Sequence, residues 1–153
     1  MRLLLVGGGC RGLELTRALV AEGHAVRVVT RTEERRTEIE AAGGECWIGD
    51  PDRIGTLRYA VANVTILLWA LDTVDRPELH GSRLEMMLER TVDTMVRGVI
   101  YEGERGREVV ERMCSLNEVP LRLLAADASD SVGWAAAARE LVFELTGPRA
   151  ARA

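Results

Sequence analysis

Residues 2–12 read RLLLVGGGCRG, and this stretch decides the fold of the chain. Its first half, residues 2–6, is a short apolar run closed by three glycines, which is typical of a buried strand followed by a turn. The apolar residues that come next are spaced to share one face of a helix: Leu13, Leu15, Leu19 and Val20. Gly23 ends this helix, because glycine is favoured just past a helix C-terminus. The chain therefore opens with a strand, a glycine-rich turn and a helix.

The same alternation of strand and helix continues along the rest of the sequence. Short apolar or β-branched runs predict five more strands, at 25–30, 45–48, 64–71, 98–102 and 121–126. Helices are predicted over 32–42, 52–62, 82–96, 104–117 and 131–146. The first of these is polar and rich in Glu and Arg, and is expected to be exposed. The next two carry apolar residues that are expected to face the core: Ile54, Leu57 and Val61, and then Leu84, Met87, Leu88, Val92 and Met95. This order implies a parallel sheet with helices on both faces. We expect a three-layer α/β Rossmann fold, doubly wound, with six parallel strands in the order 3-2-1-4-5-6.

Polar residues at two helix starts are of the types that cap helices. Ser82, with Glu85 three positions later, has the pattern of a capping box at the start of the fourth predicted helix after the glycine-rich turn. Asp127 and Asp130 precede the last helix, and a carboxylate there can accept hydrogen bonds from the free N–H groups of the first turn.

The length and composition of the chain are those of one ordinary soluble domain. Its 153 residues are 47% hydrophobic and 29% charged, enough for one substantial core. We expect a single dinucleotide-binding domain over residues 1–148, followed by a frayed tail over 149–153. The net charge of −4 offers no basic surface, so nucleic acid is not an expected partner. No run approaches the roughly 20 apolar residues of a membrane helix, so no membrane association is expected.

The cysteines and histidines do not form a metal-binding pattern. Cys10, Cys46 and Cys114 contain no CxxC pair, and His24 and His80 are not spaced to complete a zinc site. An odd number of cysteines without a disulfide framework is typical of a reducing cytoplasm. We therefore predict a cytoplasmic protein without a metal site.

Gly7, Gly9 and Gly12 form a GxGxxG pattern, which carries weight here because it follows a strand and opens a helix. In a dinucleotide site the first glycine makes the tight turn and the second lets a pyrophosphate approach the backbone. The third lets the helix pack closely on the strand. The free N–H groups and the dipole at the helix start attract phosphate. A glycine-rich turn without a ligand is the alternative.

The end of the second strand favours NADP over NAD as the cofactor. NAD sites usually carry an acidic residue there, which accepts hydrogen bonds from the ribose hydroxyls. This strand instead ends in Thr30-Arg31-Thr32, and a guanidinium pairs with a 2′-phosphate in fork geometry. Alternatively, Arg31 is a solvated residue tied to Glu33 or Glu34.

Two other residues of the glycine loop are candidates for the same site. We expect Arg11 to reach the 2′-phosphate that Arg31 binds. Cys10 is expected to be a small residue that fits against the cofactor. A redox role is the alternative for Cys10, since the dipole at a helix N-terminus can activate a thiol.

These features resemble the atypical short-chain dehydrogenases/reductases, including the NmrA-like proteins. The matching parts are the glycine loop at 7–12, Thr30-Arg31 and Gly49-Asp50-Pro51. The resemblance covers about residues 1–72. It implies that Asp50, with Pro51 after it, lies beside the adenine ring, and that Ala70 and Leu71 line the nucleotide. Members of this group commonly bind NADP(H) and either reduce small molecules or sense the cofactor.

The chain departs from this group in three respects. Its enzymes often use a Tyr-x-x-x-Lys pair, but all 20 basic residues here are arginine, so this dyad is missing. The nearest equivalent is Tyr101 with Arg105, although Tyr101 falls on the fifth predicted strand, where relatives usually carry serine. Reductases of the group usually extend beyond the sixth strand to form a substrate lobe, whereas this sequence stops there. Residues 72–80 match nothing in the group.

Tyr101 and His80 are the candidates for catalysis. His80 lies in the loop near the expected position of a nicotinamide, where it is a potential proton donor. The alternative is a loop histidine without a partner. Asp72 and Asp75 are candidates to orient a substrate, with solvated carboxylates as the alternative.

The sequence thus predicts a dinucleotide-binding protein and leaves more than one function open. The first is binding or sensing of NADP(H) without the usual dyad. An alternative is a minimal NADPH-dependent oxidoreductase whose site is completed by a second copy in a homo-oligomer. A further alternative is a regulatory nucleotide-binding domain of the potassium-transport type, although such domains usually carry an acid where Arg31 stands.

Overall fold

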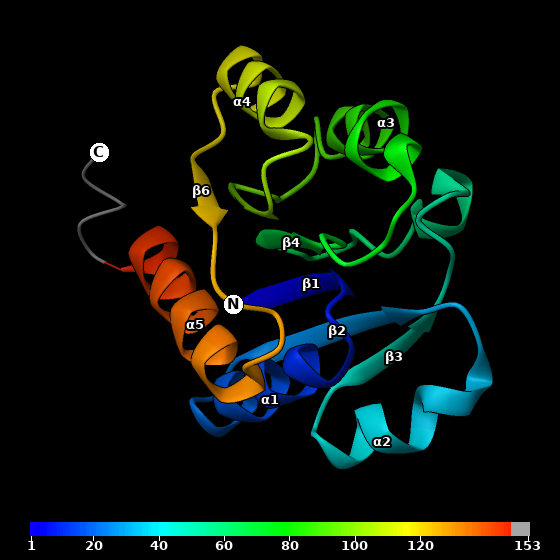
Figure 1. Ribbon diagram of the computed structural model, residues 1–153, viewed down its shortest axis with the longest axis vertical. Helices are drawn as coiled ribbons and strands as arrows, with labels where there is room; N and C mark the ends of the chain where they lie inside the picture. The colour runs from blue at the N-terminus through cyan, green and yellow to red at the C-terminus, as the bar shows by residue number, and fades with distance from the viewer. Residues whose placement is uncertain (148–153) are drawn as a thin grey trace.

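The computed structural model describes residues 1–147, which form one sheet of six parallel strands (Figure 1). The strands are β1 (Arg2–Gly7), β2 (Ala25–Thr30), β3 (Glu45–Ile48), β4 (Ile66–Ala70), β5 (Gly98–Glu102) and β6 (Leu121–Leu124). The α-helices are α1 (Gly9–Ala21), α2 (Arg36–Ala41), α3 (Ser82–Arg90), α4 (Arg107–Leu116) and α5 (Ser131–Thr146). Short 3-10 turns are η1 (Glu33–Arg35), η2 (Ile54–Leu57) and η3 (Pro77–His80). The strand order β3-β2-β1-β4-β5-β6 confirms the predicted doubly wound fold. The tail expected over 149–153 lies outside the described residues.

Helices cover both faces of the sheet and give it three layers. On one face α1 packs against α5, and α2 lies beside them. On the other face lie α3, α4 and η2. Figure 1 shows the two groups of helices on opposite sides of the strands. The two hydrophobic cores therefore lie one above and one below the sheet.

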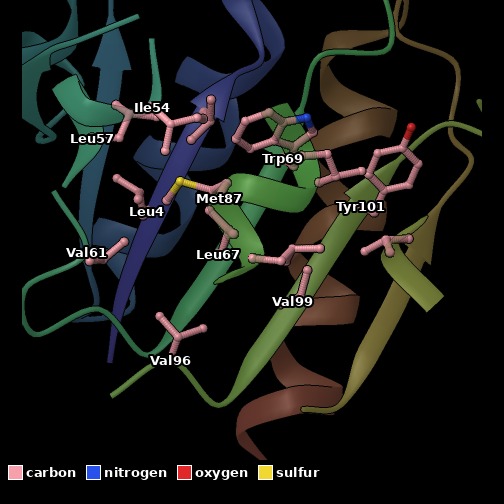
Figure 2. Close-up of a cluster of buried hydrophobic side chains, with 14 of the residues drawn as sticks. Leu4, Ile54, Leu57, Val61, Leu67, Trp69, Met87, Val96, Val99 and Tyr101 are labelled. Atoms are coloured by element: carbon pink, nitrogen blue, oxygen red, sulfur yellow. The ribbon is translucent and has the colours of Figure 1, made fainter. Parts of the chain in front are cut away.

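β1 and β4 lie at the centre of the sheet and are buried on both faces. Leu3 and Leu5 of β1 face α1 and α5, whereas Leu4 faces the core on the α3 side (Figure 2). Trp69 of β4 points into the same α3-side core and is fully buried. This burial on two faces is why both segments are continuous apolar runs in the sequence.

The helix predicted over 52–62 is wrong, because only the 3-10 turn η2 and further turns form there. The Thr56 hydroxyl lies 2.7 Å from the carbonyl oxygen of Arg53 and accepts a hydrogen bond from the N–H of Asp50 at 2.8 Å. Such bonds between a side chain and the local backbone compete with helix formation. The apolar residues expected to face inward are nevertheless buried (Figure 2): Ile54, Leu57 and Val61.

The helix predicted over 82–96 ends six residues early, at Arg90. The Thr91 hydroxyl bonds back to the carbonyl of Leu88 at 2.7 Å, and Asp93 takes a left-handed φ of 66°. A left-handed residue cannot continue a right-handed helix. Val92 and Met95, predicted to extend the buried stripe, are consequently exposed.

The two predicted helix starts have different outcomes. The capping box is wrong, because Ser82 is already inside α3 and its N-cap is Gly81, without a side-chain cap. Asp130 does cap α5, since its carboxylate accepts a hydrogen bond from the Gly133 N–H at 3.0 Å. Asp127 instead accepts hydrogen bonds from the backbone and hydroxyl of Ser129, which lower the pKa of Asp127.

Other predicted elements differ only at their ends. The strands expected at 64–71 and 121–126 shorten to β4 and β6, and the helix expected over 104–117 shortens to α4. The polar helix expected over 32–42 divides into η1 and α2. End residues are the least determined part of any helix or strand, because their backbone groups are only partly hydrogen-bonded within the element.

Candidate nucleotide-binding site

A pocket of about 480 Å³ opens at the carboxyl edge of the sheet, beyond the ends of the paired strands β1 and β4, where the strand order reverses. In doubly wound sheets this reversal of strand order is where ligands bind. Ten of the twelve residues predicted for the cofactor line its wall: Gly7, Gly9, Arg11, Thr30, Arg31, Thr32, Asp50, Pro51, Ala70 and Leu71. The other two, Cys10 and Gly12, are not on the wall.

The glycine loop brings the start of α1 to the pocket with little side-chain cover. Gly7 has a φ of +88°, and a Cβ there would lie 2.3 Å from the carbonyl oxygen of Ala70, so only glycine fits this turn. Gly9 also has a positive φ, of +52°, but a Cβ there would meet nothing within 4 Å. No side chain caps α1 at its N-cap, Gly8. The first N–H groups of the helix are therefore left for a ligand.

Gly12 and Cys10 lie in the first turn of α1 and are not on the pocket wall. A Cβ on Gly12 would lie 2.9 Å from Cδ2 of Leu5, so the glycine allows α1 to approach β1 closely. Cys10 is exposed. Cys46 and Cys114 are respectively half-buried and buried, and burial raises the pKa of both thiols, to about 11 for Cys114.

Arg11 does not reach toward a 2′-phosphate, contrary to the sequence prediction. Its guanidinium is buried beneath the loop in a two-point ion pair with Glu102, at 2.8 and 3.1 Å. It also donates to the carbonyls of Gly8 at 3.1 Å and Ala70 at 3.3 Å. Four of the five guanidinium N–H donors are thus used within the protein.

Arg31 lies on the pocket wall just after β2, where the predicted 2′-phosphate site requires a guanidinium. It is exposed on the pocket wall and, within residues 1–147, forms no ion pair and no side-chain hydrogen bond. Glu33, which the sequence offered as a partner, bonds instead to Arg36 at 2.6 Å, and this bond lowers the pKa of Glu33. Glu34 also lies on the wall, one turn beyond the strand end.

Arg35 is a second guanidinium on this wall, and the sequence analysis missed it. Its Nη2 donates to the carbonyl of Gly9 at 3.3 Å, and its Nε bonds to Glu38 at 2.6 Å. Arg35 thereby links η1 to the glycine loop. The only indication in the sequence was that Arg35 follows Arg31 by four residues. Both arginines therefore come soon after the end of β2.

The loop after β4, residues 72–80, forms the wall opposite the glycine loop. Thr73, Val74, Arg76 and Leu79 line the pocket, which gives a place to a segment that the sequence left unmatched. Arg76 reaches across to Asp52 after β3, with Nη2 to Oδ2 at 2.8 Å. An ion pair between two pocket-lining residues therefore links the loop after β4 to the loop after β3.

Asp72 and Asp75 lie on the solvent side of this loop. Both are within 4 Å of Arg105, at 3.8 and 3.7 Å. Asp75 is fully exposed, and neither aspartate lines the pocket. Arg105 also donates to the carbonyls of Asp72 and Val74, so it binds the loop rather than Tyr101.

His80 and Tyr101 are hydrogen-bonded to each other and buried, and neither lines the pocket. His80 Nδ1 lies 2.8 Å from the Tyr101 hydroxyl, which accepts a hydrogen bond from the Gly106 N–H at 2.7 Å. Burial raises the pKa of Tyr101 and lowers the pKa of His80. Burial therefore favours the neutral form of His80 and the protonated form of Tyr101. The alternative interpretation of His80, as a loop histidine without a partner, is wrong.

The pair holds η3 against the sheet. Tyr101 lies on β5 beside Trp69 of β4, and their polar atoms point to the same end of the strands (Figure 2). The indole N–H of Trp69 donates to the carbonyl of Leu79 at 2.9 Å, next to His80. Both aromatic side chains thus fix the loop that forms one pocket wall.

Glu102 is the other residue that the sequence analysis missed. It ends β5 with only 2% of its surface exposed, which is rare for a carboxylate. A glutamate at the carboxyl end of an otherwise apolar strand was its only signal in the sequence.

Some kinds of site are not found among the described residues. No group of three histidine, cysteine or acidic residues within residues 1–147 is arranged to hold a metal ion. No helix in that range is long and apolar enough to cross a membrane.

No family model matches the chain. Among curated proteins, the 4-hydroxy-2-methyl-3-oxo-4-farnesyl-3,4-dihydroquinoline-1-oxide ketoreductase of Stigmatella aurantiaca is 26% identical over 164 residues, covering 97% of this chain and 47% of that protein. An uncharacterised protein of Schizosaccharomyces pombe is 38% identical over 63 residues, covering 40% of this chain and 21% of that protein. The chain spans less than half the length of either relative.

Solved structures share the fold at low sequence identity. Triphenylmethane reductase of Citrobacter sp. complexed with NADP(H) has a TM-score of 0.65 and 19% identity, covering 81% of this chain and 48% of that one. Vestitone reductase of alfalfa has a TM-score of 0.66 and 12% identity, covering 80% and 55%. ChuY, an anaerobillin reductase of Escherichia coli, has a TM-score of 0.65 and 14% identity, covering 97% and 92%. At these identities the likeness establishes the Rossmann fold alone.

Proposed function

We propose that the chain binds NADP(H) in the pocket at the carboxyl edge of its sheet. The observation that carries this proposal is Arg31, an exposed guanidinium on the pocket wall without a partner among residues 1–147. It stands at the end of β2, where a site for NAD needs an acid. The Citrobacter reductase, which shares the fold, is complexed with NADP(H).

The residues on the wall suit the parts of this dinucleotide. The uncapped start of α1 would take the pyrophosphate through backbone N–H groups. Arg31, with Arg35 beside it, would take the 2′-phosphate. Asp50 and Pro51 would lie beside the adenine, as the resemblance to atypical short-chain dehydrogenases/reductases implies. When bound, NADPH would supply a hydride donor.

Isothermal titration calorimetry with NADPH and NADH tests the proposal. We expect the chain to bind NADPH more tightly than NADH at micromolar concentrations. Arg31→Ala should weaken NADPH binding about tenfold, because a hydrogen bond to a charged group contributes roughly 1.5–3 kcal/mol. NADH binding should be unchanged in this variant.

Arg97→Ala is the matched control, because Arg97 is exposed just before β5, at the opposite edge of the sheet. This variant should bind both dinucleotides like the parent chain. Absence of NADPH binding to the parent chain would contradict the proposal. An unchanged NADPH/NADH ratio in Arg31→Ala would contradict the role of Arg31.

A reductase is the second candidate function. The ketoreductase from Stigmatella aligns over 97% of the chain, and ChuY, a reductase, matches it over nearly the full length of both. Because the sequence has no lysine, such a reaction would proceed without a Tyr-x-x-x-Lys dyad. Binding or sensing of the cofactor without turnover is the simpler function for the site.

Turnover separates the two functions. A reductase should oxidise NADPH in the presence of some members of a panel of carbonyls, quinones and flavins, followed at 340 nm. A protein that only binds or senses the cofactor should not. If a second copy completes the active site, specific activity should rise with protein concentration in the same assay.

A further inference from the structure

Glu102 joins three segments around the pocket through a single buried carboxylate. It accepts four hydrogen bonds: from Nε and Nη2 of Arg11 at 3.1 and 2.8 Å, from the N–H of Asp72 at 2.9 Å, and from the indole N–H of Trp134 at 2.7 Å. Arg11 belongs to the glycine loop, Asp72 follows β4, and Trp134 lies on α5. The carboxylate therefore connects the phosphate loop, the opposite pocket wall and the helix beneath.

Arg11 passes this connection on to the loop backbone. The Gly8 carbonyl accepts hydrogen bonds from both Arg11 Nη1 and the Gly12 N–H, at 3.1 and 3.0 Å. The Ala70 carbonyl likewise accepts from Arg11 Nη2 and the Gly8 N–H, at 3.3 and 3.0 Å. Both carbonyls, which would repel a phosphate, are thus held by donors on the protein side.

The Arg11 guanidinium is held by the Trp134 ring and by the Glu102 carboxylate. Its carbon lies 5.1 Å from the centre of the Trp134 ring, and the indole also bonds to the carboxylate that pairs with Arg11. Arg11 is 7% exposed, and Trp134 has no exposed surface. Because the loop consists of glycines with positive φ, its own backbone is permissive, and this network is what selects one conformation.

We propose that Glu102 is a positioning residue for the phosphate loop, acting through Arg11, so that the N–H groups at the start of α1 are held ready for a pyrophosphate. This inference rests on the proposed binding of NADP(H). It assigns Arg11 to the support of the loop and leaves recognition of the 2′-phosphate to Arg31, with Arg35 beside it. A preorganised loop binds more tightly, since less conformational freedom is lost on binding.

A positioning role for Glu102 can be recognised by which ligands bind more weakly when Glu102 is replaced. NADPH and NADH both carry a pyrophosphate, whereas adenosine 2′-monophosphate reaches Arg31 without one. We expect Glu102→Gln to weaken NADPH and NADH by the same factor, about tenfold, and to leave adenosine 2′-monophosphate unchanged. Asp72 and Trp134 bond to different oxygens of the carboxylate, so glutamine keeps an acceptor oxygen for only one of them. Glutamine also loses the charge that pairs with Arg11.

Two further variants separate positioning from stability. Arg11→Met combined with Glu102→Gln removes the charge left unpaired in the single variant, so its melting temperature should recover while dinucleotide binding stays weak. Trp134→Phe removes one donor from Glu102 and keeps an aromatic ring in the core. It should weaken both dinucleotides about two- to fivefold, and it provides the same test if the other variants do not fold.

Glu45→Gln is the control, because Glu45 on β3 is an ion-paired carboxylate too, bonded to Arg2 and Arg27, but it lies away from the pocket. It should leave all three ligands unaffected. Parent-like dinucleotide binding by the folded Glu102 and Trp134 variants, or an equal loss for all three ligands, would overturn the inference. If the parent chain does not bind NADPH at all, it is the proposed function that fails.

Discussion

Two arginines near the glycine loop differ in their surroundings more than in their chemistry. Arg11 is buried and uses four donors within the protein, whereas Arg31 is exposed and uses none within residues 1–147. A buried guanidinium needs a paired carboxylate, and Glu102 supplies it. Residue type alone therefore does not tell an arginine that is open to a ligand from one that is bonded within the protein.

Gly9 and Gly23 form a matched pair for testing the loop at the scale of single residues. Both have a positive φ, and a Cβ at either would meet no atom within 4 Å. Alanine at either position should cost about 1–2 kcal/mol of unfolding free energy, because left-handed backbone is unfavourable for residues with a Cβ. Urea denaturation followed by circular dichroism measures this cost.

Only Gly9→Ala should affect binding, because Gly9 lies on the pocket wall and Gly23 lies beyond the far end of α1. A Cβ on Gly9 would occupy space that the phosphates need. We expect its NADPH affinity to fall at least about tenfold, measured by calorimetry, while Gly23→Ala binds normally. Equal affinities for the two variants would argue against a pyrophosphate beside Gly9.

At the scale of elements, helix starts depend on backbone geometry more than on residue type. Ser82 has the right identity for a cap, yet the chain enters α3 at Gly81 with a φ of −134° and a ψ of −105°. Asp130 caps α5 because the turn before it, held by Asp127 and Ser129, presents its carboxylate to the Gly133 N–H. The same residue class thus caps one helix and not the other.

Replacing Asp130 or Ser82 by alanine tests whether each residue caps its helix. Asp130→Ala should lower the unfolding free energy by about 1 kcal/mol, which is the typical contribution of an N-cap. Ser82→Ala should change it by less than about 0.5 kcal/mol, as expected for an exposed residue without a specific contact. Chemical denaturation of both variants measures the difference, and a larger loss for Ser82→Ala would show that it does cap α3.

At the scale of the whole molecule, the buried pair of His80 and Tyr101 links stability to pH. Burial lowers the pKa of His80 in the folded chain below its ordinary value of 6.5, and nearby Arg105 lowers it further while Asp72 opposes this. The unfolded chain therefore binds a proton more readily than the folded one. The contribution of His80 to stability is therefore complete above about pH 6.5 and is lost as the pH falls through the pKa of the folded state.

Thermal unfolding measured between about pH 7 and 5 tests this link. The melting temperature of the parent chain should fall across this range, and His80→Gln should have a shallower fall. His24→Gln is the control, because His24 is partly exposed near the N-terminus. A slope that His24→Gln removes and His80→Gln keeps would contradict this account of the buried pair.

The sequence by itself determined the strand order and half of the residues that line the pocket. These follow from local information: apolar runs mark strands, glycines mark the loop, and the ends of neighbouring parallel strands must meet at one edge. Ten of the twelve residues predicted for the cofactor lie on the pocket wall for this reason. Their role in binding NADP(H) remains a prediction.

Only the tertiary structure decided which polar side chains pair. Glu102 is 91 residues from Arg11 and 32 from Trp134, and His80 is 21 residues from Tyr101. No local pattern records such partners, because burial and distance between strands arise only when the sheet and helices pack. Arg11 therefore bonds to Glu102 and to the carbonyls of Gly8 and Ala70, because the neighbouring strands β1, β4 and β5 bring that carboxylate beside it.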